Sequence, residues 1–158
     1  MIGLIKAKEL HGRHPGLDFP IDMENVADLV DCICVDWSFE GQATEVKRSR
    51  WIGLAVWLDK RERRRLIAHA IGHHLLHCGN QLYLYIWQKP TVGKQEREAE
   101  EFAAHFLIPE KELDRVSHWQ LKDIAEHFGV PVDFLWRRLT VYSTQEELRR
   151  WQAQSQEI

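Results

Sequence analysis

Four of the nine histidines of this chain lie between His69 and His77. On a helix that turns by about 100° per residue, His73 lies about 40° and His77 about 80° round from His69. Imidazoles four residues apart are one turn apart, so that two of them can bind a single metal ion. The spacing therefore predicts a metal-binding pair at His69 and His73. The alternative is a set of core histidines that bond to backbone carbonyl groups.

The residues around these histidines indicate that the helix is buried. Apolar side chains are spread almost all round it, as is typical of a helix covered on every side: Leu66, Ile67, Ala68, Ala70, Ile71, Leu75, Leu76 and Cys78. Buried imidazoles need polar partners, because an unpaired polar group in the interior costs free energy. A metal ion would supply such a partner.

A second helical segment offers the third metal ligand. In KQEREAEEFAAHFLIP, Glu96 and Glu100 lie on or beside the apolar stripe, whereas Glu98, Glu101 and His105 lie near the opposite face. Carboxylates are rarely buried unless they are paired or bind a metal. We therefore expect Glu96 to bind the metal and Glu100, one turn later, to accept the second ring N–H of a ligand histidine. The alternative is a pair of solvated glutamates at the edge of the stripe.

The elements that must position these residues follow from hydrophobic periodicity and from turn residues. Helices are expected at 22–30 with Asp22 as the cap, from 60 to a stop at Gly79, and at 94–108, 119–128, 132–140 and 144–156. Strands are expected at 31–39 and 51–58, a hairpin loop or irregular strand at 41–50, a short strand or aromatic loop at 81–88, and an irregular segment at 1–20. This order predicts an α+β fold with helices dominating the second half.

The two helical segments together resemble a known family. His69-Ala70-Ile71-Gly72-His73 looks like the HExxH helix of zincins without its glutamate, and Glu96 to Glu100 looks like the E-x-x-x-D/E element of gluzincins. The wider context, RRRLIAHAIGHHLLH followed by EREAEEFAAHFLIP, resembles the ImmA/IrrE family of metallopeptidases. The resemblance is strong over about residues 51–109 and looser to about residue 139.

This resemblance implies a minimal zincin-like domain, a small sheet plus the active-site helix, at residues 1–110. A helical tail at 111–158 would pack on the same domain. It also implies a Zn²⁺ site in which His69, His73 and Glu96 are the ligands. The implied activity is cleavage of a helix-turn-helix transcriptional repressor in the cytoplasm, which would switch on gene expression.

The resemblance also implies a substrate-binding strand. In such folds the edge strand beside the active helix binds the peptide, and here that strand would be the 51–58 segment, with Gly53, Leu54 and Ala55 at its centre. An ordinary core strand is the alternative interpretation of the same run.

Ala70 is the one departure from the family motif. Active members have glutamate there as the general base, and alanine cannot transfer a proton. The chain is therefore expected to bind metal but to be inactive. Two explanations remain open, an engineered inactivating substitution and a natural pseudopeptidase that sequesters a repressor. We favour the first, because every other motif position is intact.

The helical tail has helix-turn-helix spacing at Ala125, Gly129 and Leu135, which raises DNA binding as a weaker alternative. The second helix of this motif, which would contact the DNA bases, has only four polar residues for that purpose: Asp133, Arg137, Arg138 and Thr140. The net charge of the chain is −3. We therefore expect packing or protein binding rather than direct DNA binding. The basic run at 60–65 is expected to be mostly a solvated helix start, with contact to an acidic substrate as the alternative.

Three features favour a reducing, cytoplasmic compartment. The cysteines, Cys32, Cys34 and Cys78, are few and odd in number, so that reduced thiols are expected. No apolar run approaches 18 residues, and the first residues do not look like a signal peptide. Membrane association is therefore not expected.

Overall fold

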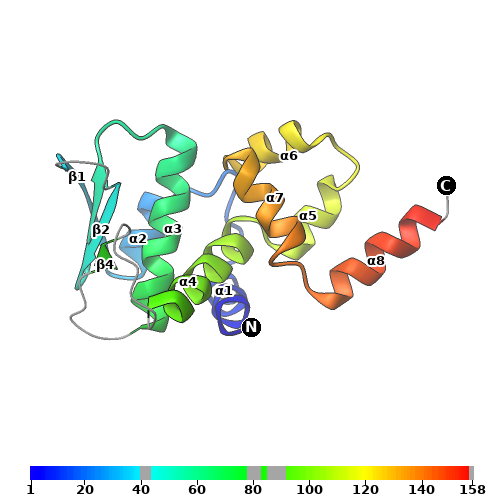
Figure 1. Ribbon diagram of the computed structural model, residues 1–158, viewed down its shortest axis with the longest axis horizontal. Coiled ribbons are helices and arrows are strands. Elements are labelled where there is room, and N and C mark those ends of the chain that lie inside the picture. The colour runs from blue at the N-terminus through cyan, green and yellow to red at the C-terminus, as the bar shows by residue number, and fades with distance from the viewer. Residues whose placement is uncertain (40–43, 78–82, 85–91, 157–158) are drawn as a thin grey trace.

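The computed structural model describes residues 1–39, 44–77, 83–84 and 92–156 (Figure 1). The helices are α1 (Ile2–Arg13), α2 (Met23–Leu29), α3 (Lys60–Leu76), α4 (Val92–Leu107), α5 (Glu110–Val116), α6 (Leu121–Phe128), α7 (Val132–Thr140) and α8 (Gln145–Gln156). The strands are β1 (Ile33–Trp37), β2 (Glu45–Arg48), β3 (Trp51–Ala55) and β4 (Tyr83–Leu84). This is an α+β fold consistent with a minimal zincin-like domain and a helical C-terminal region, as predicted.

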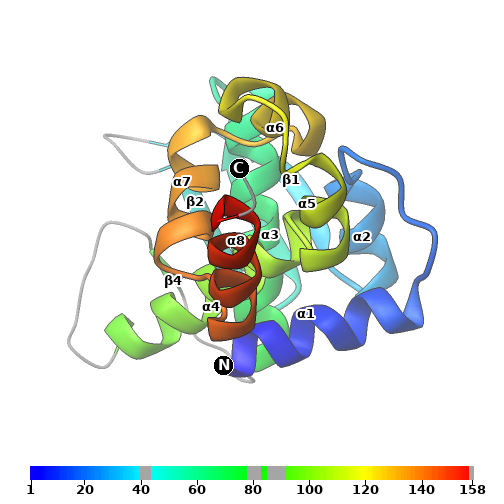
Figure 2. The same ribbon diagram turned by 90° about the vertical axis from the view of Figure 1, so that its right-hand side faces the viewer.

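The sheet has the strand order β1-β3-β2-β4. Strand β3 pairs in parallel with β1 and antiparallel with β2. Helices α2 and α3 lie on one side of the sheet, and α5 to α8 lie beyond α4, on the side away from the sheet (Figures 1 and 2). Helix α3 therefore stands between the sheet and the C-terminal helices. No helix among the described residues is long and apolar enough to cross a membrane.

The prediction that residues 51–58 form an edge strand that binds the substrate is wrong, because β3 is an interior strand. Gly53 is opposite Val35 of β1 and Val46 of β2, and Leu54 is opposite Asp36 and Glu45. The N–H of Ala55 donates to the carbonyl of Thr44 at 3.0 Å. With both edges of β3 hydrogen-bonded, a peptide cannot add to it, and the run at 51–55 is an ordinary core strand.

The prediction of an irregular segment at 1–20 is wrong for residues 2–13, which form helix α1. Gly3, Ala7 and Leu10 are its buried residues, at spacings of four and three that a helix brings to one side. Gly3 allows a very close approach to α4, since a Cβ there would lie 2.5 Å from the carbonyl oxygen of Glu98. The second helix is as predicted, with the Asp22 carboxylate accepting from the N–H of Asn25 at 3.1 Å.

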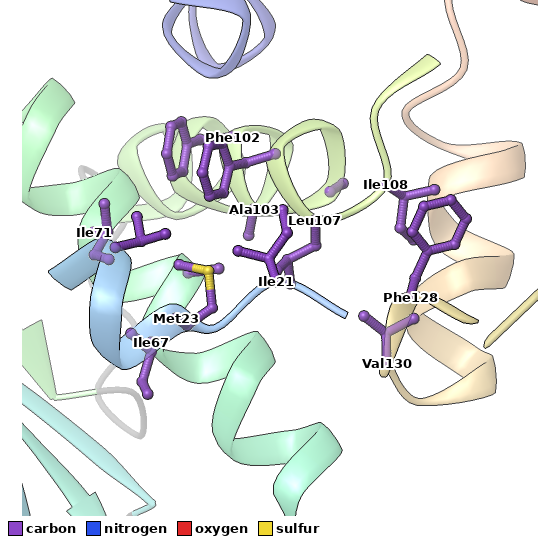
Figure 3. Packing of buried hydrophobic residues seen from close by; sticks show 14 of the residues in the cluster. Ile21, Met23, Ile67, Ile71, Phe102, Ala103, Leu107, Ile108, Phe128 and Val130 are labelled. Carbon is purple, nitrogen blue, oxygen red and sulfur yellow. The ribbon is translucent and has the colours of Figure 1, made fainter. Parts of the chain in front are cut away.

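The hydrophobic core is continuous from α3 through α4 into the C-terminal helices. Figure 3 shows side chains of α3, of α4, of the start of α2 and the segment before it, and of the C-terminal region packed against one another: Ile67, Ile71, Phe102, Ala103, Leu107, Met23, Ile21, Ile108, Phe128 and Val130. The three predicted tail helices are present as α6, α7 and α8, and α5 is an additional one. The predicted domain boundary at residue 110 stays a prediction.

Three further predictions concern the cysteines, the end of the histidine-bearing helix and the 81–88 segment. Cys32 and Cys34 are free thiols, and burial raises the pKa values of these groups to about 11 and about 12. Cys78 and the proposed stop at Gly79 lie outside the described residues. Of the 81–88 segment the structure describes residues 83–84, which form strand β4.

A buried ion pair fixes α8 against α7. Arg138 and Glu147 both have side chains that are 0% exposed. Arg138 Nη1 donates to Glu147 Oε2 at 3.1 Å, and Arg138 Nε donates to the carbonyl oxygen of Ile108 at 3.0 Å. The pair therefore ties the last two helices to the end of α4.

We expect Glu147→Ala to lower the free energy of unfolding by about 3–5 kcal/mol, because it leaves the Arg138 charge buried without its partner. Urea unfolding followed by circular dichroism measures this change. The double variant Arg138→Met/Glu147→Leu should lose less, since it removes both charges. An equal loss in the single and double variants would contradict this account of the pair.

Candidate metal centre

Two helices bring the candidate site together, and a glycine sets the distance between them. Helix α3 begins after Asp59, whose carboxylate accepts from the N–H of Glu62 at 2.8 Å. One turn before its end, α3 crosses α4 at Gly72. A Cβ on Gly72 would lie 2.9 Å from the carbonyl oxygen and 3.0 Å from the Cα of Ala99. Only glycine allows this approach without displacing α4, which carries Glu96.

The structure places three of the predicted site residues around one point. His69 Nε2 lies 3.0 Å from Glu96 Oε2, and His73 Nε2 lies 2.9 Å from Glu96 Oε1. The two histidine Nε2 atoms are 3.1 Å apart. Within the described residues these three side chains form a group whose ligand atoms all lie within 4.8 Å of one another. The geometry is therefore that of a possible metal site.

The donor atoms fit a zinc ion. His69 Nδ1 lies 2.9 Å from Glu100 Oε1, so a neutral His69 ring donates there and presents the lone pair of Nε2 to the site. That lone pair, His73 Nε2 and the Glu96 carboxylate converge, an arrangement that a cation stabilises. Ligand atoms of a tetrahedral site with bonds of about 2.0–2.1 Å lie about 3.3 Å apart, close to the separations found here.

Charge compensation in the site is strong. Burial by itself would lower the pKa of His69, but the carboxylates of Glu45, Glu100 and Glu96 raise it well above its usual value. Burial would raise the pKa of Glu96, whereas His69 and His73 lower it below its ordinary value. In His73 the effect of burial prevails, and its pKa is lowered. The site thus holds its carboxylates ionised, as metal ligands must be.

Glu100 lies where its predicted role, accepting the second ring N–H of His69, requires. Besides His69, its carboxylate lies 3.8 Å from Arg65 Nη2 of α3 and 3.4 Å from Arg137 Nη1 of α7. Burial opposes its ionisation, but His69 and the two arginines lower the pKa of Glu100 to about 2. A C-terminal helix therefore contributes a charged group to the site.

The two arginines of this cluster were not predicted as site residues. The run at 60–65 was expected to be mostly solvated, which is wrong for Arg65, whereas Arg63 and Arg64 are half-buried. Arg63 binds Glu24 and Asp36, Arg64 donates to the carbonyl oxygens of Ile21 and Gly129, and Arg65 is buried against Glu62 and Glu100. Apart from Glu62, which is three residues from Arg65 on α3, these partners lie on other elements, and no local pattern identifies them.

His77 and His74 are not part of the ligand group. His73 Nδ1 is 3.0 Å from His77 Nδ1, and His77 Nε2 is 2.8 Å from Glu98 Oε2. His77 and Glu98 therefore hold the ring nitrogen of His73 that is turned away from the candidate site. His74 Nε2 donates to the carbonyl oxygen of Val30 at 3.1 Å. Both histidines have structural partners.

Glu45 is a further carboxylate beside the site that sequence reasoning missed. It lies on β2, is 4% exposed, and burial raises its pKa to about 7. Its Oε2 atom has no hydrogen-bond partner among the residues that the structure describes. The 41–50 segment looked polar throughout. Only the alternation of the strand, which buries Glu45 and Lys47 more than Val46, reveals its orientation.

Ala70, at the position of the missing general base, is fully buried on α3 between the two histidines. Its side chain ends at Cβ and carries no group that accepts a proton. A general base in this site must therefore be another residue.

We expect Glu100→Ala to weaken zinc binding about 10–100-fold, since it removes the group that orients the His69 ring. Competition with a fluorescent zinc chelator measures the affinity. Glu112→Ala is the control, because Glu112 pairs with His127 and Arg115 away from the site. Equal affinities in the two variants would contradict the orienting role.

Comparison with known families gives one match. The family model described as the IrrE N-terminal-like domain, of the M78 peptidases, matches residues 37–140. The matched range contains β2, β3, α3 and α4, and therefore His69, His73 and Glu96. No curated protein matches the chain.

Proposed function

This chain belongs to the M78 peptidase family with the IrrE N-terminal-like domain, and we propose that it is a zinc-dependent endopeptidase. The observation that carries the proposal is the convergence of His69, His73 and Glu96 within 4.8 Å at the crossing of α3 and α4. Two histidines and a glutamate are a ligand set of catalytic zinc sites, which leave a further coordination position free.

The residues around the three ligands have separable roles. Bound zinc would polarise the scissile carbonyl group and make the attacking water more acidic. Glu100 orients His69 through Nδ1, and His77 orients His73 in the same way. Glu96 is the most exposed of the three ligands, with 27% of its side chain accessible, whereas the histidines are buried. Substrate would therefore reach the site from the side of Glu96.

We propose a helix-turn-helix transcriptional repressor as the substrate and the cytoplasm as the compartment. The family match and the resemblance of the two motif helices support the first, and the free Cys32 and Cys34 thiols support the second. Both candidate base-reading arginines of the tail are paired with carboxylates of this chain. Arg138 is buried against Glu147, and Arg137 contacts Glu100. This use of both arginines supports a protein partner rather than DNA.

Proteolysis in the presence and absence of metal tests the proposal. The zinc-loaded chain and an EDTA-treated sample are incubated with purified helix-turn-helix repressors of the source organism, and new N-termini are identified by mass spectrometry. We expect one of the repressors to be cut at a defined bond by the zinc-loaded chain only. Cleavage that persists in EDTA would contradict a metal-dependent mechanism.

Ala70 favours a second candidate function, a pseudopeptidase that binds and sequesters a repressor. The same samples distinguish the two, because sequestration gives a stable complex on size-exclusion chromatography without new N-termini. Cleavage by the zinc-loaded chain would contradict this second function.

A further inference from the structure

We propose that Glu45 of strand β2 is the general base of this site, in place of the glutamate that the family motif has at position 70. The inference rests on the proposed function, because it assigns a role in the peptidase reaction. It also gives an account of Ala70 in which the chain is active without any engineered change. The expectation of inactivity considered position 70 alone.

The strand register directs Glu45 toward the site. Glu45 is opposite Leu54 of β3, and Leu54 is fully buried. On β2 the residues at alternate positions, Glu45 and Lys47, are buried, while Val46 between them lines the apolar hollow on the other face of the sheet. The buried face of β2 is therefore the face toward α3. The charge of Glu45 acts on His69 and also on Glu96 and Arg65.

Glu45 is a buried carboxylate with one oxygen atom that is unsatisfied within the part of the chain that the structure describes. The residue is 4% exposed, and its Oε2 atom is bonded to none of the described residues. Such a carboxylate costs free energy in the folded protein unless another group occupies the space before it. A water molecule or a substrate at the metal would occupy that space.

Glu45 stands next to the ligand group but is not a member of it. Within the described residues, the ligand atoms that lie within 4.8 Å of one another belong to His69, His73 and Glu96 only. A general base needs this arrangement, since it must reach the attacking water rather than bind the metal. The other acid–base candidates near α3 have different partners, because His77 is bonded to Glu98 and His74 to Val30.

The chemical step needs no further reactant. Glu45 accepts a proton from the attacking water while the water oxygen forms its bond to the scissile carbonyl carbon. The same proton is then delivered to the amide nitrogen as the C–N bond breaks. A carboxylic acid and an amine are formed, one water is consumed, and Glu45 returns to its ionised form.

The test compares the unaltered chain with Glu45→Gln and with the control Glu112→Gln, all loaded with zinc. Glutamine keeps the size of the side chain and removes its basicity. Three quantities are measured on each protein: bound zinc per chain, affinity for acetohydroxamate by calorimetry, and cleavage of fluorogenic casein. A hydroxamic acid gives up a proton when it binds zinc, so that its affinity depends on a proton acceptor in the site even without turnover.

We expect Glu45→Gln to keep one zinc per chain, to bind acetohydroxamate at least about tenfold more weakly, and to cleave casein about 10²–10⁴-fold more slowly. Glu112→Gln should match the unaltered chain. Thermal melting checks that both variants fold. If none of the proteins cleaves casein, the acetohydroxamate affinities alone test whether Glu45 is the proton acceptor.

Either of two kinds of result, in zinc content or in acetohydroxamate binding, would overturn the inference while leaving the proposed function intact. One is loss of zinc in Glu45→Gln, which would make Glu45 a ligand. The other is retained zinc with unchanged acetohydroxamate affinity, or no acetohydroxamate binding even by the unaltered chain. Failure of the unaltered chain to bind zinc would instead overturn the proposed function, and the inference with it.

Discussion

Glutamate at position 70 is expected to restore peptidase activity to the Glu45→Gln chain by about 10²–10⁴-fold, the contribution of a positioned general base. Position 70 lies about 100° round α3 from His69 and about 60° from His73, beside the two ligands. A glutamate carboxylate there extends beyond the Cβ at which Ala70 ends. Casein cleavage by zinc-loaded Glu45→Gln and Glu45→Gln/Ala70→Glu measures the gain.

A matched variant separates basicity from bulk in this rescue. Glu45→Gln/Ala70→Gln has a side chain of nearly the same size at position 70 but no basic group, and should remain as slow as Glu45→Gln alone. Glutamate also has good helix propensity, so helix α3 should be retained. Equal activity of the glutamate and glutamine variants would contradict a general-base role at this place in the site.

Zinc at about 1,000 times its dissociation constant is expected to raise the free energy of unfolding by about 4 kcal/mol, because it binds the folded state. For a chain of this length that corresponds to a rise in melting temperature of about 8–16 °C. Differential scanning calorimetry with and without zinc measures the shift. EDTA should reverse it.

The rise in melting temperature that zinc causes should become smaller as the pH is lowered. The raised pKa of His69 means that the metal-free protein holds a proton there at neutral pH, which zinc must displace. Zinc affinity, and with it the stabilisation, should therefore fall as the pH is lowered. His73→Ala should abolish the shift at every pH. A zinc-induced shift that survives in His73→Ala would contradict the ligand assignment.

The helices that carry the site could be predicted because their signals are local. The four-residue spacing of His69 and His73 sets their relative direction on any helix. Glu96 and Glu100 lie on the apolar stripe of α4, which must face the core. Both sets of residues could therefore be assigned to one site before the positions of the helices were known.

The arrangement of the sheet could not be predicted in the same way. The sequence pattern of residues 51–58 fits an edge strand and an interior strand equally well. Only the pairing of β3 with β1 and β2 excludes the addition of a peptide. Glu45 was missed for a related reason. Its orientation depends on the register of β2 against β3, which is set by contacts between strands rather than by the composition of the 41–50 segment.

Long-range polar contacts were also beyond the sequence patterns. Arg65 and Arg137 meet at Glu100 although they come from α3 and α7. Helix α1 was missed because its buried residues are small and few, and its position depends on the close approach of Gly3 to α4. In each case the deciding partner lies on another element.

Bound zinc per chain tests the central claim most directly. The unaltered chain, Glu96→Ala and Glu101→Ala are purified, incubated with zinc, desalted and analysed for metal. Glu101 is the matched control, because it lies on α4 but binds the amino terminus and the N–H of Gly3. We predict one zinc per chain in the unaltered protein and in Glu101→Ala, and almost none in Glu96→Ala. Equal zinc in all three proteins would contradict the site built from His69, His73 and Glu96.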